Sequence, residues 1–146
     1  MSKQLTKDTV ISILKCGYKV NDELSAMFKT HGISLPQFNV LRILRGRKGE
    51  AANLSTIQEQ MIHKMSNTTR LIDKLIEGGY VNRFVCKKNR RKIEIFITKK
   101  GLELLSSLDL QLDAKEQFLL NNVEDKEKEE LMRLLSKVQT SITSET

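Results

Sequence analysis

Residues 55–98 read STIQEQMIHKMSNTTRLIDKLIEGGYVNRFVCKKNRRKIEIFIT and contain the most informative pattern of apolar, turn and basic residues in the chain. The first four residues of this stretch, Ser55-Thr-Ile-Gln58, form a capping-box pattern and predict a short helix over about residues 55–62. A tight turn and a second helix over residues 66–77 follow, because apolar side chains recur there at helical spacing. The Gly78-Gly79 pair then ends this second helix.

The spacing of the apolar residues changes after the second helix. Residues 80–85 and 92–97 are predicted to be strands around a basic turn, and Ile93-Glu94-Ile95 shows the alternation of a half-buried strand. This order is that of a winged helix-turn-helix, which consists of a short helix, a tight turn, a second helix and a two-stranded ribbon. The predicted fold class is therefore mainly α with a small β-hairpin wing.

Helices are also predicted on both sides of this motif. Apolar residues at helical spacing indicate a long helix over about residues 8–30. A capping box formed by Ser34 and Gln37 opens a helix over about residues 35–45. After the ribbon, helices are predicted over about residues 99–120 and 124–142.

The net charge of +7 is concentrated in one segment of the chain. Residues 1–63 carry nine Lys/Arg and five Asp/Glu (+4), residues 64–101 carry eleven and three (+8), and residues 102–146 carry five and ten (−5). A basic cluster of this size indicates a polyanionic partner, and double-stranded DNA suits an exposed helix beside a ribbon. The alternatives are a solvated basic surface, or a winged helix that docks an acidic protein partner.

The second helix of the motif carries the residues expected to face the major groove. Asn67 lies in its first turn and Arg70 lies one turn further on. The other candidates on this helix are Ser66, Thr69 and Lys74. The Asn67 amide can pair with adenine N6 and N7, and Arg70 can bind guanine O6 and N7 or a phosphate. The hydroxyl groups of Ser66 and Thr69 suit phosphate oxygens. In the simpler interpretation Ser66 only caps the helix and Arg70 is only solvated.

The turn between the two strands carries a dense group of cations, relieved only by Asn89. The cations are Lys87, Lys88, Arg90, Arg91 and Lys92. Because like charges on a tight turn repel one another, the group indicates a bound anion. Neighbouring arginines at a loop tip suit the minor groove, where narrow A·T tracts concentrate negative potential. The predicted DNA contacts of the wing are therefore Lys87, Lys88, Arg90 and Arg91.

Several short motifs resemble the MarR family, the multiple-antibiotic-resistance-type regulators. The resemblance covers nearly the whole chain and is strongest over residues 33–101. The motifs are Ile33-Ser-Leu-Pro-Gln-Phe38, Thr69-Arg-Leu-Ile-Asp-Lys-Leu75, Gly79-Tyr-Val-Asn-Arg83, Asn89-Arg-Arg91, and Ile95-Phe-Ile-Thr98 with Gly101. Their order and spacing, rather than any one of them, make the resemblance specific. One position departs from the family: the usual acid of the wing, which braces an arginine, is replaced by Asn89.

The resemblance implies a single MarR-like domain over residues 1–146 that forms an obligate homodimer. The winged helix-turn-helix core would span residues 33–101, and the helices in 8–32 and 102–142 would interlock two copies. The implied function is that of a sequence-specific transcriptional regulator that binds a pseudo-palindromic operator in double-stranded DNA. It would act as a repressor that a small-molecule or redox signal releases.

Other classes of protein fit the sequence less well. The histidines are His31 and His63 alone, and there is no nucleophile-and-base pattern and no glycine-rich phosphate loop, so neither an enzyme nor a cofactor is expected. Cys16, Cys86 and the histidines include no close pair of ligands, so no metal site is predicted. No apolar run approaches the roughly 20 residues that span a membrane, and no signal peptide is predicted.

The two cysteines favour reduced thiols and a cytoplasmic protein. Cys16 lies in the predicted first helix, near Tyr18, where some MarR-like peroxide sensors carry a reactive cysteine. A redox role for Cys16 is one interpretation. A buried, unreactive thiol is the simpler one.

Overall fold

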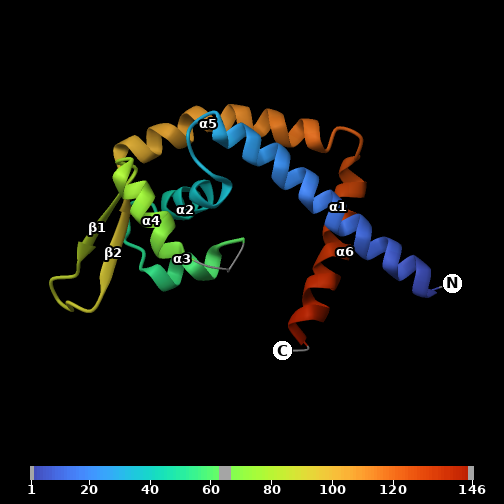
Figure 1. The fold of residues 1–146 in the computed structure, drawn as a ribbon, viewed down its shortest axis with the longest axis horizontal. Coiled ribbons are helices and arrows are strands. Elements are labelled where there is room, and N and C mark those ends of the chain that lie inside the picture. The colour runs from blue at the N-terminus through green and yellow to red at the C-terminus, as the bar shows by residue number, and fades with distance from the viewer. Residues whose placement is uncertain (1, 63–66, 145–146) are drawn as a thin grey trace. The chain divides into compact units, whose positions relative to one another are not determined.

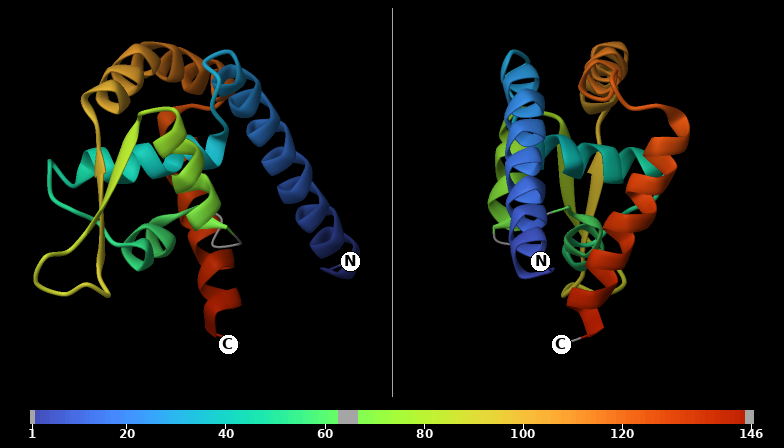
Figure 2. Two further views of the ribbon diagram at one scale, coloured as in Figure 1. Left: turned by 60° about the vertical axis from the view of Figure 1, so that its left-hand side comes forward. Right: turned by 90° about the vertical axis from the view of Figure 1, so that its right-hand side faces the viewer.

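The computed structural model describes residues 2–62 and 67–144, so His63 and Ser66 lie outside the described residues. The chain forms two compact units, Met1–Leu112 and Asp113–Thr146. The elements along the chain (Figure 1, Figure 2) are α1 (Ser2–Lys29), α2 (Leu35–Gly46), α3 (Leu54–Gln60), α4 (Thr68–Glu77), β1 (Val81–Val85), β2 (Ile93–Ile97), α5 (Lys99–Leu119) and α6 (Asp125–Ser144). This order confirms the predicted fold class, a mainly helical winged helix-turn-helix with a two-stranded wing.

The predicted capping box at the start of α2 is confirmed. The backbone N–H of Gln37 donates to Ser34 Oγ at 3.2 Å, and the backbone N–H of Ser34 donates to Gln37 Oε1 at 2.8 Å. Pro36 sits in the first turn, where its missing N–H leaves no hydrogen bond unmade. The reciprocal pair fixes the angle at which the chain enters α2.

The predicted capping box at the start of α3 is wrong. Asn53 is the N-cap, and its Oδ1 accepts hydrogen bonds from the backbone N–H of Thr56 at 2.7 Å and from the hydroxyl of Thr56 at 2.9 Å. Ser55 therefore lies inside the helix, which begins at Leu54. Asparagine is at least as good an N-cap as serine, and here it comes first along the chain.

The wing is an antiparallel ribbon in which Val81 pairs with Ile97 and Val85 pairs with Ile93. The backbone of Ala52 adds a bridge to Ile95 on the other side of β2. Ile95 is buried, as the alternation predicted, but Ile93 is 41% exposed. The outer half of the ribbon extends beyond the core (Figure 2), so only its inner half is covered.

The core of the first unit brings together α2, α3, α4, the wing and the adjoining parts of α1 and α5. The Phe28 and Phe38 rings stack with their centroids 4.4 Å apart, which joins the end of α1 to α2. The largest fully buried side chains are Phe28, Leu41, Leu44, Ile57, Ile72, Leu75, Ile95, Leu105 and Leu108. Burying a side chain of this size contributes about 1.5–3 kcal/mol, so this cluster supplies the main driving force for folding.

The start of α5 packs tightly against the end of α4. The Thr98 hydroxyl donates to the Gly79 carbonyl at 2.7 Å and accepts from the Gly101 backbone N–H at 3.1 Å, so Thr98 caps the start of α5. Lys100 Nζ donates to the Gly78 carbonyl at 2.7 Å and lies 4.9 Å from the centre of the Tyr80 ring. These contacts hold the base of the wing against α4.

Two side-chain pairs join the middle of α5 to the segment around α2. Arg45 Nη1 donates to both carboxylate oxygens of Asp109, at 3.1 and 3.0 Å. His31 Nε2 and Gln111 Oε1 lie 3.0 Å apart, within hydrogen-bond distance. Arg45 is therefore already paired within the chain.

The second unit consists of the end of α5 and the helix α6. On α6, Arg133 forms an ion pair with Glu130, and this hydrogen bond lowers the pKa of the Glu130 carboxyl and raises that of the arginine. Large apolar side chains are nevertheless exposed on this helix, and they are Leu131, Met132, Leu134, Val138 and Ile142. Within residues 2–62 and 67–144, no helix is both long and apolar enough to cross a membrane.

Candidate nucleic-acid interface

The helix α4 separates a buried face from an exposed one. Ile72 and Leu75 are buried against the core, whereas Thr69, Arg70 and Lys74 are exposed. Positions 70 and 74 are one helical turn apart, so both cations lie on the same side of the helix. Three of the five side chains predicted to meet DNA from this helix are thus accessible in the structure.

Asn67 has a different position from the one that the sequence predicts. It is the N-cap of α4 rather than a residue of its first turn, and its backbone is left-handed, with φ at 41°. Its side chain is exposed and makes no capping hydrogen bond to the helix. Asparagine tolerates this backbone better than most residues. The amide therefore projects at the start of α4 without serving as its cap.

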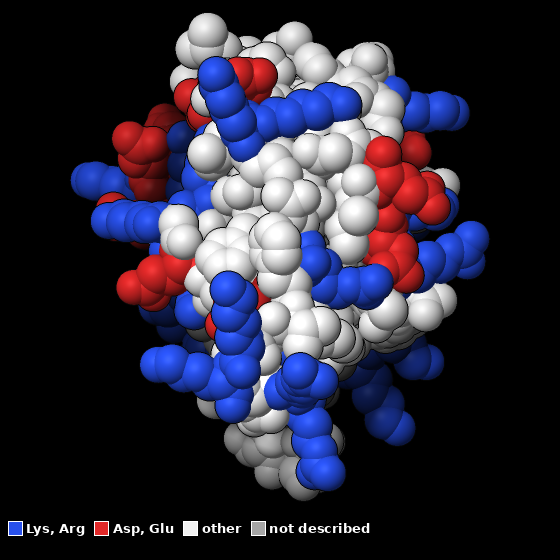
Figure 3. All heavy atoms as spheres, turned by 90° about the vertical axis from the view of Figure 1, so that its left-hand side faces the viewer, with Lys and Arg blue, Asp and Glu red and all other residues white. Residues whose placement is uncertain are grey.

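The turn of the wing is ordered by Asn89. Its Oδ1 accepts from the backbone N–H of Arg91 at 3.1 Å, and its carbonyl accepts from the backbone N–H of Lys92 at 2.9 Å. The Asn89 amide thus builds this turn by hydrogen bonds, without a carboxylate. The predicted contacts Lys87, Lys88, Arg90 and Arg91 are all exposed on it. Figure 3 shows the Lys and Arg side chains that gather on this side of the molecule.

An ion pair that the sequence analysis did not predict joins α4 to the wing. Arg83 Nη1 on β1 lies 3.1 Å from Asp73 Oδ1 on the exposed side of α4. Both residues belong to motifs quoted above, but no spacing rule links a helix position to a strand position ten residues later. The pair places the exposed face of α4 next to the basic ribbon, so the two sets of candidate contacts adjoin.

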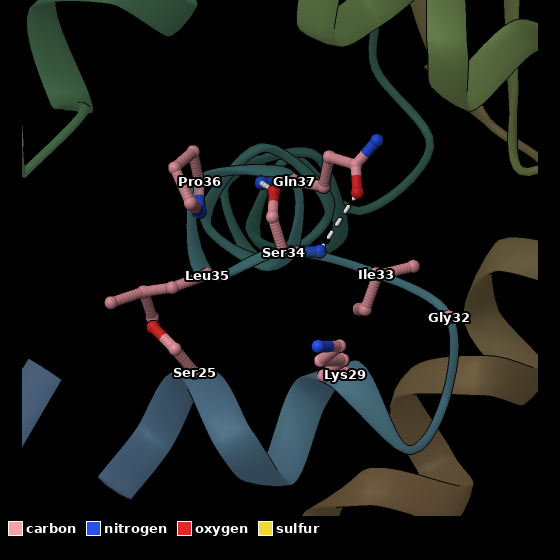
Figure 4. Close-up of a pocket in the computed structure, with 8 residues that line it drawn as sticks. All are labelled: Ser25, Lys29, Gly32, Ile33, Ser34, Leu35, Pro36 and Gln37. Atoms are coloured by element: carbon pink, nitrogen blue, oxygen red, sulfur yellow. Dashed lines mark hydrogen bonds between the residues drawn. The ribbon is translucent and has the colours of Figure 1, made fainter. Parts of the chain in front are cut away.

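A cavity of about 430 Å³ lies between the end of α1 and the start of α2 (Figure 4). It is lined by Ser25, Lys29, Gly32, Ile33, Ser34, Leu35, Pro36 and Gln37. Apolar side chains, two hydroxyl groups and one ammonium group therefore share this space. Such a volume falls within the range of small-molecule sites in proteins.

The two thiols differ in exposure. Cys16 is exposed on α1, so the simpler interpretation of a buried thiol does not hold for the described chain. Cys86 is partly buried at the base of the basic turn, where its backbone N–H donates to the Lys92 carbonyl at 2.9 Å.

The fold and this surface define a winged helix-turn-helix protein with a basic wing. Residues 33–93 match the MarR family. The transcriptional regulator PecS of Dickeya dadantii is 25% identical over 126 residues, which cover 86% of this chain and 76% of PecS. The transcriptional regulator PapX of Escherichia coli is 27% identical over 97 residues, which cover 66% of this chain and 59% of PapX. The chain thus spans less than two thirds of the length of PapX.

Solved structures share the fold over most of the chain. A MarR transcription factor from Planctomyces limnophilus is 27% identical with a TM-score of 0.73, covering 90% of this chain and 95% of that one. A mutant of Escherichia coli MarR, complexed with operator DNA, has a TM-score of 0.77 and is 23% identical. The alignment covers 86% of this chain and 89% of that one. Bordetella bronchiseptica BpsR, whose DNA binding is regulated by 6-hydroxynicotinic acid, has a TM-score of 0.80 and is 16% identical. The alignment covers 90% of this chain and 98% of that one. The chain is thus similar to the MarR family over residues 33–93, and the curated relatives named above are transcriptional regulators.

Proposed function

We propose that this protein is a sequence-specific regulator of transcription that binds double-stranded DNA as a homodimer of single MarR-like domains. The observation that carries the proposal is the Arg83–Asp73 pair, because it sets the exposed face of α4 beside the basic wing. A helix can enter the major groove while the adjoining ribbon follows the backbone into the minor groove. The fold is shared with a MarR protein solved on its operator, which supports this mode of binding.

In this proposal the candidate residues divide into two kinds of contact. Asn67 and Arg70 read base edges, because the start of a recognition helix is the part that reaches them. Ser66, Thr69 and Lys74 hold phosphates beside them. The wing residues Lys87, Lys88, Arg90 and Arg91 bind the backbone and the minor groove, which carry little information on base identity.

Exposed apolar side chains on the terminal helices support the homodimer. In α1, Leu14 is 67% and Tyr18 is 73% exposed, and in α6, Ile142 is 64% exposed. Apolar surface of this extent marks a site of association. A two-fold symmetric dimer requires two-fold symmetry in its DNA, so the operator is a pseudo-palindrome.

Selection of bound fragments from random duplex DNA tests the proposal. We expect the selected site to be a pseudo-palindrome with half-site centres about 10 bp apart, bound saturably and with an affinity that falls steeply with salt. Recovery of unrelated fragments with equal affinities would contradict sequence-specific binding. Capture of an acidic protein by the wing, without preference among duplexes, would favour the protein-docking alternative instead.

We further propose that the regulator is a repressor and that a small organic acid releases it. The cavity between α1 and α2 supports this, because Ile33, Leu35 and Pro36 offer apolar contact while Lys29 offers a charge for a carboxylate. BpsR, which shares the fold, is regulated by 6-hydroxynicotinic acid. We expect hydroxylated aromatic carboxylates to dissociate the complex with the selected duplex.

Two variants test the released-repressor proposal. Lys29→Met is expected to raise the concentration of acid needed for release by about tenfold or more, because a charged hydrogen bond is lost. Lys19→Met, which removes a charge outside the cavity lining, should leave that concentration unchanged. A reporter gene placed behind the selected site should be silenced by the protein and restored by the acid. An equal response of both variants would argue against the cavity as the site.

A redox signal through Cys16 is the second route of release, and the exposure of this thiol favours it. In this proposal the protein acts in the cytoplasm, where its thiols are kept reduced until an oxidant appears. Hydroperoxide should weaken DNA binding by the parent protein more than by Cys16→Ser. If both proteins respond alike, Cys16 is not the sensor.

A further inference from the structure

The side of the wing that faces away from the core carries a pair of aromatic rings, of which Phe84 is exposed and Phe96 is partly buried. Alternation along the two strands puts Val81 and Ile95 on the covered side, and Phe84 and Phe96 on the opposite one. The Phe84 side chain is 54% exposed. Its ring meets the Phe96 ring edge to face, with the centroids 6.0 Å apart at an interplanar angle of 62°.

These two rings belong neither to the buried core nor to the proposed DNA contacts. The core is closed on the other side of the ribbon by Val81 and Ile95, and the cations that suit phosphates lie on the turn beyond the rings. Edge-to-face stacking holds both rings in place before any partner arrives, so little side-chain freedom is lost when they are covered. A pre-ordered aromatic pair of this kind is typical of a contact surface.

The charges around the rings indicate what covers them. Glu94 lies directly opposite Phe84 in the ribbon, and Lys92 is two residues before it, just ahead of the start of β2. A uniformly acidic partner would bring its carboxylates up to Glu94, which disfavours it. In a two-fold arrangement of two such ribbons, by contrast, Glu94 of each copy can meet Lys92 of the other while the rings stack.

We propose that this outer wing face, formed by Phe84, Phe96, Glu94 and Lys92, binds the same face of a second copy seated at a neighbouring site on the DNA. The inference rests on the proposed function, since the second copy is brought there by its own operator. It adds a contact between dimers to the contact within each dimer. The expected consequence is cooperative binding to adjacent operators.

The contact is too small to hold two copies together in solution. Stable interfaces bury roughly 1,600 Å² in total, far more than two ring pairs can supply. Two molecules bound side by side on one duplex, however, face each other at an effective concentration on the order of millimolar. The DNA phosphates also neutralise the neighbouring cations of the turn, which would otherwise repel. Cooperativity therefore appears only on DNA.

The test compares one duplex selected by the parent protein with duplexes that carry two copies of that site. Spacings between the sites are varied in steps of about 5 bp, half a helical turn, so that neighbouring molecules alternate between the same and opposite sides of the helix. We expect the second dimer to bind about tenfold more tightly than the first at in-phase spacings and equally at out-of-phase ones. Phe84→Ala should abolish this gain and leave single-site affinity within about twofold.

Charge variants and a control on the opposite side sharpen the test. Glu94→Lys should remove the cooperativity, and adding Lys92→Glu in the same chain should restore part of it, which mere loss of folding would not allow. Val85→Ala removes an exposed apolar side chain from the covered side of the ribbon and should keep the cooperativity intact. Thermal unfolding of each variant reports whether it folds as the parent does.

The outcomes separate the inference from the proposed function. Tight binding to the single site with independent binding at every spacing would overturn the inference and leave the proposed function standing. Cooperativity that survives both Phe84→Ala and Glu94→Lys would also overturn it, because another surface would then be responsible. Failure of the parent to bind any selected single site would overturn the proposed function and this inference with it.

Discussion

At the residue scale, Asn67 combines an exposed amide with a left-handed backbone. Glycine adopts this backbone at no steric cost, so Asn67→Gly removes the amide and keeps the geometry. We expect Asn67→Gly to lose about 1–3 kcal/mol of affinity for the preferred site and to relax the preference at one base pair per half-site. Its thermal stability should not fall. Titrations on the selected and a scrambled duplex measure the first effect, and a melting curve measures the second.

The alanine variant at the same position serves as the control. Asn67→Ala also lacks the amide, but its side chain disfavours a positive φ, so a loss of stability is expected in addition to the loss of affinity. Equal weakening on the selected and the scrambled duplex by Asn67→Gly would show that Asn67 does not read a base.

Gly101 shows how tightly the start of α5 is packed. A Cβ atom at this position would lie 2.5 Å from the Tyr80 carbonyl oxygen and 2.7 Å from Ile97 Cγ1, and a backbone oxygen cannot easily move away. We expect Gly101→Ala to lower the free energy of unfolding by about 1–3 kcal/mol. Gly46→Ala, where nothing lies within 4 Å of the added atom, should cause no such loss. Urea unfolding of both variants measures the difference, and equal stabilities would contradict this packing argument.

The residue scale is where prediction from sequence was least complete. The Ser34–Gln37 capping box was predicted and confirmed, since both partners lie within one turn of helix. The same pattern at Ser55 was wrong because a competing cap, Asn53, stood two residues earlier. The left-handed backbone of Asn67 was not predicted, because asparagine is compatible with both helical and left-handed backbones and local sequence does not choose between them.

At the element scale, the wing is a basic turn that Asn89 orders without a carboxylate. Asn89 is neutral, so no adjacent carboxylate reduces the positive potential of Arg90 and Arg91. We expect Arg90→Ala and Arg91→Ala each to weaken binding to all duplexes and to reduce the salt slope of binding by about one unit. Arg133→Ala on α6, which removes an arginine already paired with Glu130, should leave the slope unchanged. Unchanged affinity and slope in the wing variants would identify the turn as a solvated loop.

Most of the element order followed from the sequence, because the apolar spacing changes clearly between helices and strands. The bounds differ by one or two residues in most cases and by more in α1, which begins at Ser2 where a start near residue 8 was predicted. Its first two turns contain a single apolar residue, Leu5, and therefore give no apolar period to detect. Contacts between elements, such as Arg83–Asp73 and Arg45–Asp109, were not predictable because they depend on the angles at which elements pack.

At the scale of the whole molecule, the apolar side chains of α1 and α6 lead to a prediction about assembly. In sedimentation at micromolar concentration without DNA, the protein should have about twice the mass of the 16.8 kDa chain. Leu134→Lys places a charge among the exposed apolar residues of α6 and should shift the protein towards the monomer. Ser136→Lys adds the same charge on the other side of that helix and should not. A parent protein that sediments as a monomer would contradict the homodimer.

The bridge between Ala52 and Ile95 has a further consequence, which concerns solubility. It gives β2 a backbone partner on both sides at this point, whereas β1 pairs only with β2 within the described residues. A strand edge of this kind can add a strand from another molecule and so begin aggregation. The shortness of β1 and the charge of Arg83 oppose such addition. Lengthening this strand with β-branched residues would therefore be the change in the wing most prone to cause aggregation.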